Sequence, residues 1–181
     1  LTLYASQASS PFCSASTTNS FSEDTPQVPV IGGSGNVCAN TISDFFIDLP
    51  SILVGESFEW SISPAEAGSI ISNQGSSLCS VQWNDFSGMA SLNVTSSICD
   101  LSESGQLPVN VSNLAPPVIN QSGTLCLNSS QPLTLSTPQN YASYAWSPAG
   151  PGSTSNSFVV NNPGLHQLSV TDANGCEATA Y

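Results

Sequence analysis

The chain has 181 residues, a formal net charge of −12, and no lysine or arginine. Proteins bind phosphate groups and anionic lipid surfaces chiefly through lysine and arginine, so this composition argues against nucleic-acid and membrane partners. Hydrophobic residues make up 39% of the chain, which is enough for a core, and no apolar run approaches the roughly 20 residues of a membrane helix. We therefore expect a folded acidic protein that does not insert into a membrane.

The beginning of the chain resembles the end of a module found later in it. The alternating segment 1–5 is followed by Cys13, just as the alternating segment 91–95 is followed by Cys99. We therefore interpret residues 1–27 as the C-terminal strands of a preceding repeat together with a linker.

An internal repeat sets the remaining boundaries. Segment 29–40 recurs as segment 117–128, with Pro, Val, Ile, Ser, Gly, Cys and Asn at matching positions. Such self-similarity indicates tandem modules. We predict one β-sandwich over residues 28–114 and a second over residues 115–181, whose last strand is incomplete or ends at the chain terminus.

Strand signals dominate both modules. Short runs alternate apolar with polar residues, and turn sequences rich in Asn, Gly and Pro separate them, while helix signals are nearly absent. Each module also places a tryptophan, Trp60 or Trp146, on an alternating strand. A tryptophan on the third strand of an immunoglobulin-type sandwich packs between the sheets. The prediction is an all-β chain of tandem immunoglobulin-like β-sandwiches with Trp60 and Trp146 in the cores. The alternative is that these indoles form an exposed platform for sugars.

The first module resembles the PKD-like domains of very large secreted surface proteins of Bacteroidota, on the segments 35–38, 58–60, 68–75 and 81–83. The second resembles the Ig-like repeat of the same proteins, above all through Val-Thr-Asp-Ala-Asn-Gly-Cys at 170–176. The resemblance implies export by the type IX route and a role in adhesion, gliding or filament building. It implies no catalytic residue. Cys79 departs from the pattern, because an apolar strand residue is expected there.

Six cysteines without a zinc-type pair indicate disulfides in an oxidising compartment. Matching the modules suggests the bridges Cys38–Cys99 and Cys126–Cys176. The first cysteine of each pair must then lie on a first-strand segment that extends to the end of the sandwich where the last hairpin turns. Cys13 and Cys79 stay unassigned: Cys13 is expected to find its partner upstream, and Cys79 is either free and buried or paired with Cys13.

Catalytic patterns are weak. A nucleophilic triad needs a histidine beside an activated Ser or Cys. The single histidine, His166, is expected to face solvent on a strand, and the local carboxylate pairs 44/48 and 56/59 lie near no distinctive motif. We expect no enzymatic activity and no cofactor. One candidate metal site remains, a calcium site at Asp172 and Asn174, although Asp-x-Asn-Gly is also an ordinary hairpin turn.

These observations favour a non-enzymatic structural or adhesive segment of a large extracellular protein at the cell surface or in a filament. The expected partners are neighbouring repeats, other protein subunits or surface glycans. Two alternatives stay open: an accessory carbohydrate-binding or spacer module of a secreted hydrolase, and a filament subunit that exchanges strands. More copies of the repeated segment in a longer reading frame would favour the adhesin.

Overall fold

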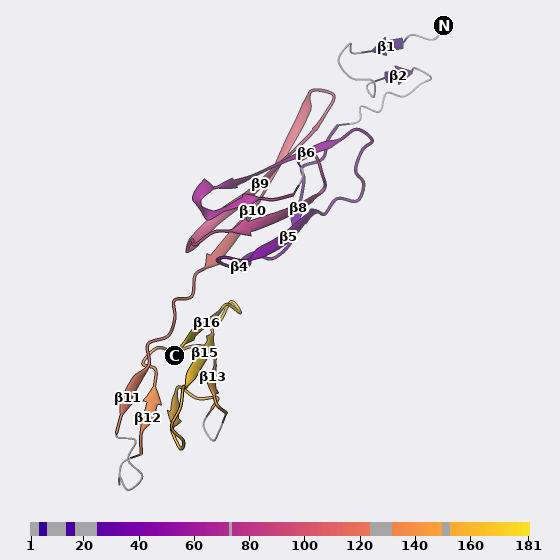
Figure 1. Ribbon diagram of the computed structural model, residues 1–181. Coiled ribbons are helices and arrows are strands. Elements are labelled where there is room, and N and C mark those ends of the chain that lie inside the picture. Colours follow the sequence, from indigo (N-terminus) through magenta and orange to yellow (C-terminus); the bar gives the residue numbers. More distant parts are fainter. Residues whose placement is uncertain (1–3, 7–13, 17–24, 73, 124–131, 150–152) are drawn as a thin grey trace. The chain divides into compact units, whose positions relative to one another are not determined.

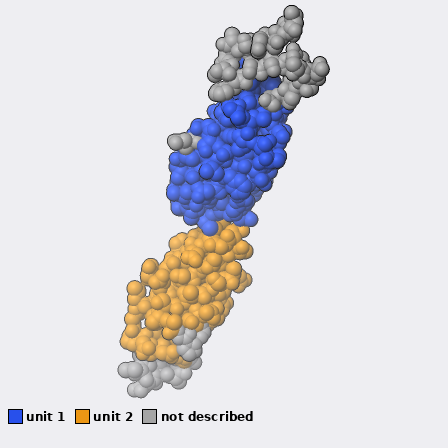
Figure 2. Space-filling view, turned by 90° about the vertical axis from the view of Figure 1, so that its right-hand side faces the viewer, with its two compact units in different colours: residues 1–111 blue, residues 112–181 orange. Residues whose placement is uncertain are grey.

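The chain folds into β-sandwiches, as Figure 1 shows. It divides into two compact units, residues 1–111 and 112–181 (Figure 2). Apart from the 3-10 helix η1 (Ala65–Ala67), every regular element in the described part of the chain is a strand, which confirms the expected all-β class. The computed structural model describes residues 4–6, 14–16, 25–72, 74–123, 132–149 and 153–181.

The first strands form a small antiparallel pair. β1 (Tyr4–Ser6) and β2 (Ser14–Ser16) pair along their whole length, with Ala5 opposite Ala15. That this hairpin ends a preceding repeat stays a prediction. Cys13 lies outside the described residues.

Unit 1 is a sandwich of two four-stranded sheets. The first sheet, in spatial order, consists of β3 (Ile31–Gly32), β5 (Ile42–Ile47), β8 (Leu78–Trp83) and β7 (Gly68–Ile70). The second consists of β4 (Asn36–Cys38), β10 (Leu101–Ser112), β9 (Gly88–Ile98) and β6 (Ser57–Ser63). The sandwich of unit 1 thus starts in one sheet with β3 and crosses to the other with β4, as immunoglobulin-like sandwiches do.

Alternation along the strands builds the core of unit 1. On β9 every second residue from Ala90 onward points inward, and Leu92 and Val94 are fully buried. On β8 the inward residues are Cys79, Val81 and Trp83. Since buried apolar area stabilises at roughly 25 cal/mol per Å², these inward rows hold the two sheets together.

Unit 2 is a smaller sandwich with the same layering (Figure 1). One sheet consists of β11 (Asn120–Ser122), β12 (Thr134–Ser136) and β14 (Ser157–Val159), and the other of β13 (Ser143–Ser147), β15 (Gln167–Thr171) and β16 (Glu177–Ala180). Its core gathers around Leu168, Val170 and Trp146, with Leu135 and Phe158 from the facing sheet.

Both expected core tryptophans are buried at matching places. Trp60 on β6 is 2% exposed and Trp146 on β13 is 3% exposed. Each indole Nε1 donates a hydrogen bond of 2.9 Å to a backbone carbonyl oxygen, that of Ser76 or Ser155, just before the strand that faces it. Neither indole lies on the surface, so neither can form the platform for sugars.

The outer edge of each tryptophan strand is already hydrogen-bonded. β6 is the last strand of its sheet. On its open side the amide of Gln74 accepts from the backbone N–H of Trp60 (2.8 Å) and donates to the Trp60 carbonyl oxygen (2.9 Å). In unit 2 the Ser153 carbonyl oxygen accepts from the backbone N–H of Trp146 at 2.8 Å. Short segments therefore replace a neighbouring strand at these two positions.

Replacing either tryptophan with alanine should lower the free energy of unfolding of its unit by about 3–5 kcal/mol, because the change leaves a large cavity and an unpaired carbonyl group. Urea unfolding followed by circular dichroism measures this loss for Trp60→Ala and Trp146→Ala. Tyr181→Ala is the control, since Tyr181 is 74% exposed and its loss should change stability by at most about 0.5 kcal/mol. A loss below about 1 kcal/mol for either tryptophan would contradict the core assignment.

Candidate functional site

The cysteine framework differs from the one expected. Cys38, Cys99 and Cys176 are each disulfide-bonded. Cys99 forms the turn between β9 and β10, where Ile98 faces Leu101. β4 lies at the other end of β10, where Asn110 N donates to the Gly35 carbonyl oxygen at 2.8 Å. The strand between Leu101 and Asn110 spans roughly 30 Å at about 3.3 Å per residue.

The predicted Cys38–Cys99 bridge is therefore wrong, since bonded cysteines have Cα atoms within about 7 Å. The bridge would need β4 to lie beside the turn between β9 and β10, and β4 lies at the opposite end of β10 instead. Cys126 lies outside the described residues, so its pairing with Cys176 stays a prediction.

Cys79 is free and buried, one of the two outcomes expected for it. It is 1% exposed and lies opposite Phe45 on β5. In unit 2 the same place, opposite Leu135, is taken by Phe158. Cys79 thus occupies the position of an apolar strand residue, and burial raises the pKa of its thiol.

Asp172 organises the hairpin that was considered for calcium. Its Oδ1 accepts hydrogen bonds from the backbone N–H groups of Asn174 (2.8 Å) and Cys176 (2.9 Å), and its Oδ2 accepts one from Ser112 Oγ (2.6 Å). Gly175 completes the turn with φ 85°. Oδ1 is thus used inside the turn and Oδ2 by Ser112, which favours the hairpin interpretation over a metal site. Within the described ranges no three His, Cys, Asp or Glu side chains come together as a metal-binding group.

The pKa of Asp172 lies below its ordinary value. Burial alone would raise it, but the hydrogen bonds from Ser112 and from the backbone amides of Cys176 and Asn174 outweigh that effect. These bonds also attach Ser112, at the start of unit 2, to the hairpin before β16.

The other polar candidates do not form a catalytic group. His166 precedes β15 and is half-buried against Phe158, with ring centroids 5.8 Å apart, so the expectation that it faces solvent on a strand is wrong. Glu56 accepts hydrogen bonds from Leu53 N (2.8 Å) and Ser96 Oγ (2.5 Å). Asp44 accepts one from Ser80 Oγ at 2.6 Å. Each is engaged separately.

The two outer faces of unit 1 differ in chemistry. Outward residues of the β6–β9–β10 sheet are mainly Ser, Thr, Asn and Gln, and several bond to one another, as Thr95 and Ser104 do at 3.1 Å. The outer face of the β5–β8–β7 sheet carries large apolar side chains around Asp44 and Ser80. We call it the apolar face; its members are Ile42 (58% exposed), Phe46 (45%), Ile71 (53%) and Leu78 (64%).

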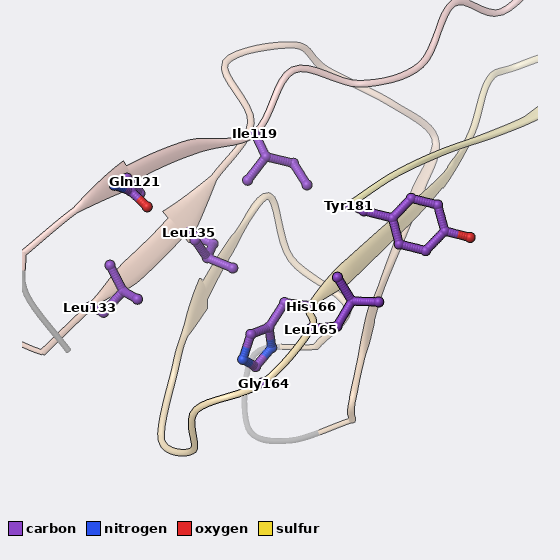
Figure 3. Close-up of a pocket in the computed structure, with 8 residues that line it drawn as sticks. All are labelled: Ile119, Gln121, Leu133, Leu135, Gly164, Leu165, His166 and Tyr181. Atoms are coloured by element: carbon purple, nitrogen blue, oxygen red, sulfur yellow. The ribbon is translucent and has the colours of Figure 1, made fainter.

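A groove of about 370 Å³ lies at the margin of unit 2 (Figure 3). One wall comes from β11 and β12 and the other from the segment before β15 and from Tyr181. It bears no acidic side chain. We call it the margin groove; it is lined by Ile119, Gln121, Leu133, Leu135, Gly164, Leu165, His166 and Tyr181.

Sequence reasoning found neither the apolar face nor the margin groove. Alternation shows which residues of a strand share a face, but not how β5 and β8 are paired, and this register is what gathers Ile42, Phe46 and Leu78. A clue was present, since Leu165 and Tyr181 are large apolar residues outside any inward-facing row.

No family model matches the chain, and no curated protein matches it. Among solved structures the chain is similar to an ICAM-5 D1–D4 ectodomain fragment, at 9% identity over 86% of this chain and 46% of that one, with a TM-score of 0.46. It is also similar to bovine butyrophilin, at 10% identity over 86% of this chain and 93% of that one, with a TM-score of 0.32. An amphioxus IgVJ-C2 molecule is similar at 11% identity over 80% of this chain and 96% of that one, with a TM-score of 0.33. The chain thus spans less than half of the ICAM-5 fragment. No helix in the described segments has the length and apolarity needed to cross a membrane.

In the native protein a thiol reagent should leave Cys79 unmodified, because the side chain is buried and its thiolate is disfavoured. Modification should become complete in denaturant. Mass spectrometry of chymotryptic peptides locates the label, since trypsin has no cleavage site here. Leu78→Cys, at a neighbouring position that is 64% exposed, is the control and should react at once. Equally fast native labelling of Cys79 would show that the core is open.

Asp172→Asn should destabilise the protein at neutral pH, and the difference from the parent should shrink as the pH falls below about 4. A carboxyl group with a lowered folded-state pKa stabilises the fold above its unfolded-state pKa, and this contribution is lost as the pH falls through the folded-state value. Urea midpoints at pH 7, 5 and 3 measure the difference. Glu103→Gln, at an exposed position of β10, should show no comparable trend. An effect of Asp172→Asn that is the same at all three pH values would contradict this role.

Proposed function

We propose that the chain is a non-enzymatic, adhesive segment of a large extracellular surface protein, and that the apolar face of unit 1 is its contact surface. The observation that carries this proposal is the asymmetry between the two outer faces of the same sandwich. One carries mainly Ser, Thr, Asn and Gln with the single exposed apolar side chain of Met89 on β9, whereas the other exposes four large apolar ones. Contiguous exposed apolar area on a soluble domain marks an interaction site.

The apolar face also suggests the chemistry of its partner. Asp44 lies in the middle of the patch, opposite Ser80, with Ile42 and Phe46 on either side of it along β5. A partner with apolar groups and a basic group in their midst would complement it. Because the chain has no Lys or Arg, a second copy offers no such group. The partner is therefore a different molecule.

Three observations support an extracellular, non-catalytic role. Disulfide-bonded Cys38, Cys99 and Cys176 indicate an oxidising environment. The carboxylates of Asp44, Glu56 and Asp172 are each taken up by hydrogen bonds within the fold. The tandem sandwiches suit export to a cell surface, with the type IX route, gliding or filament building as the specific form that the resemblance to Bacteroidota repeats suggests.

The hydrolase-accessory alternative has less support. Its carbohydrate-binding form needs an exposed aromatic platform, and both Trp60 and Trp146 are buried. The spacer form remains compatible with the fold. The strand-exchange alternative has an observation in its favour, the margin groove.

Adhesion should depend on the apolar face. The protein is immobilised on beads and tested against arrayed extracellular proteins and glycans, with release of sugars or peptides measured in parallel. Leu78→Ser should reduce the strongest interaction about tenfold or more, because a buried Leu contributes roughly 1.5–3 kcal/mol. Met89→Ser, on the polar face at a similar exposure of 62%, is the matched control and should bind normally.

Two outcomes would overturn the proposal. One is equal loss of binding in Leu78→Ser and Met89→Ser, which would remove the apolar face as the contact surface. The other is turnover of a polysaccharide or peptide that a point substitution within the chain abolishes.

A further inference from the structure

The sheet that carries the apolar face is open along part of β5. Two strands flank β5, with β8 on one side and the short β3 on the other. β8 pairs with β5 from Ile42 to Phe46, whereas β3 pairs only with Phe46 and Ile47. On the side away from β8, the first part of β5 therefore has no described neighbour in its sheet.

The hydrogen bonds on either side of β5 show which backbone groups face this gap. Ile47 N donates to the Ser77 carbonyl oxygen on the β8 side at 2.9 Å, and Asp48 N donates to the Val30 carbonyl oxygen on the β3 side at 2.8 Å. Because the backbone groups of successive strand residues point to alternate sides, residues 42 and 44 face the β3 side, as residue 48 does. No described residue bonds to their N–H or C=O groups there. We call this stretch the β5 opening.

A glycine in an unusual conformation ends β3 before it can fill the β5 opening. β3 ends at Gly32, and the next residue, Gly33, has φ 144°. A Cβ atom at Gly33 would lie 2.4 Å from the ring of Phe45, so both the backbone conformation and the space require glycine. By Gly35 the chain is bonded to the other sheet, where the Gly35 carbonyl oxygen accepts from Asn110 N at 2.8 Å. The opening thus follows from the path of the chain between the two sheets.

The side chains next to the β5 opening belong to the apolar face. Ile42 is 58% exposed, and Asp44 is exposed two residues further along the same face. The Asp44 carboxylate accepts from Ser80 Oγ through Oδ1 at 2.6 Å, while Oδ2 has no hydrogen-bond partner within the described part of the chain. A strand placed in the opening would have one side chain beside an isoleucine and one beside a carboxylate.

We propose that the partner of the apolar face adds a strand to the β5 opening. The strand runs antiparallel to β5, in line with β3, and exchanges backbone hydrogen bonds with residues 42 and 44. It carries a basic side chain opposite Asp44 and a β-branched apolar one opposite Ile42. In such strand addition the main-chain hydrogen bonds provide the affinity, and the alternating side chains provide the specificity. This inference rests on the proposed function, because it assigns a binding mode to the same surface.

Charge favours a different polypeptide over a second copy as the source of the strand. The chain has a net charge of −12 and no Lys or Arg, so a copy has no such residue to place opposite Asp44. If β5 paired with β5 of a copy, the two Asp44 carboxylates would lie directly or diagonally opposite each other, and like charges in that position destabilise a strand pair. A basic strand is instead attracted by the charge of the whole protein.

The probe for the test is the acetylated and amidated peptide Arg-Thr-Val-Thr, added to isotope-labelled protein while the backbone amide signals are followed by NMR. We expect saturable shifts centred on the amides of Ile42 and Asp44, and slower hydrogen exchange of both, because their N–H groups become bonded. N-methylation of the Arg and Val amides, which face β5, should weaken binding about tenfold or more, since it removes the donors that β5 needs. N-methylation of the two Thr amides, which face away, is the matched control and should leave binding unchanged.

Two variants of the protein test the charge pair. Asp44→Asn should weaken binding of this peptide about two- to fivefold, and it should leave binding of the same peptide with Gln in place of Arg unchanged. Asp48→Asn is the control, because it removes the same charge from an exposed position just after β5, where the backbone is already bonded to Val30. This variant should bind the Arg peptide normally.

The inference is overturned if the two N-methylated peptides bind alike, if the shifts centre elsewhere, or if no saturable shift occurs at millimolar peptide. Shifts that depend on protein concentration in the absence of peptide would identify pairing between copies and would equally overturn it. These outcomes leave the proposed function standing, since that is tested by Leu78→Ser, opposite Phe46 and outside the β5 opening. Conversely, equal binding of Leu78→Ser and Met89→Ser to the arrayed partners would remove the proposed function, whatever the peptide does.

Discussion

The buried indole, on β6 in unit 1 and on β13 in unit 2, is the contact on which each sandwich depends. It lies between the two sheets, and its single N–H donates to a backbone carbonyl oxygen next to the opposite sheet, from Trp60 to Ser76 and from Trp146 to Ser155. The hydrogen bond fixes the depth and orientation of the ring, and the ring in turn sets the spacing of the sheets. In a chain without Lys or Arg, side-chain salt bridges to basic residues cannot share this role, so stability depends on packing, hydrogen bonds and disulfides.

The packing around the indoles shows how the two modules reach similar cores with different side chains. In unit 1 a large residue on β5 faces a small one on β8, Phe45 opposite Cys79. In unit 2 the sizes are exchanged, since Leu135 faces Phe158, which stacks on Trp146 at 5.7 Å. Cores tolerate substitutions that preserve total volume and pattern. The thiol at position 79 is therefore understandable as the small partner of Phe45.

Alternation and the internal repeat were sufficient to predict the fold class and the burial of Trp60 and Trp146, because both properties depend on local periodicity. The bridge Cys38–Cys99 failed for a physical reason. The repeat aligns the openings of the modules correctly, but it does not show that β4 adds to the far end of β10, opposite the Cys99 turn. The margin groove was equally out of reach, since its walls come from segments far apart in the sequence, β11 and β12 on one side and the segment before β15 on the other. Asp172 could be placed in a hairpin turn from its Asn-Gly neighbours, but its bond to Ser112 joins residues distant in sequence.

The hydrogen bonds on the outer side of the tryptophan strands have a consequence for a polypeptide made of similar modules. Sandwiches connected in series are held at high local concentration, and the unpaired edge of one can recruit a strand from its neighbour while both are folding. At Trp60 the side-chain amide of Gln74 occupies both backbone groups that such a strand would need, and at Trp146 the carbonyl group of Ser153 occupies one. Each module thereby hinders strand exchange with a similar module at the edge of its tryptophan strand.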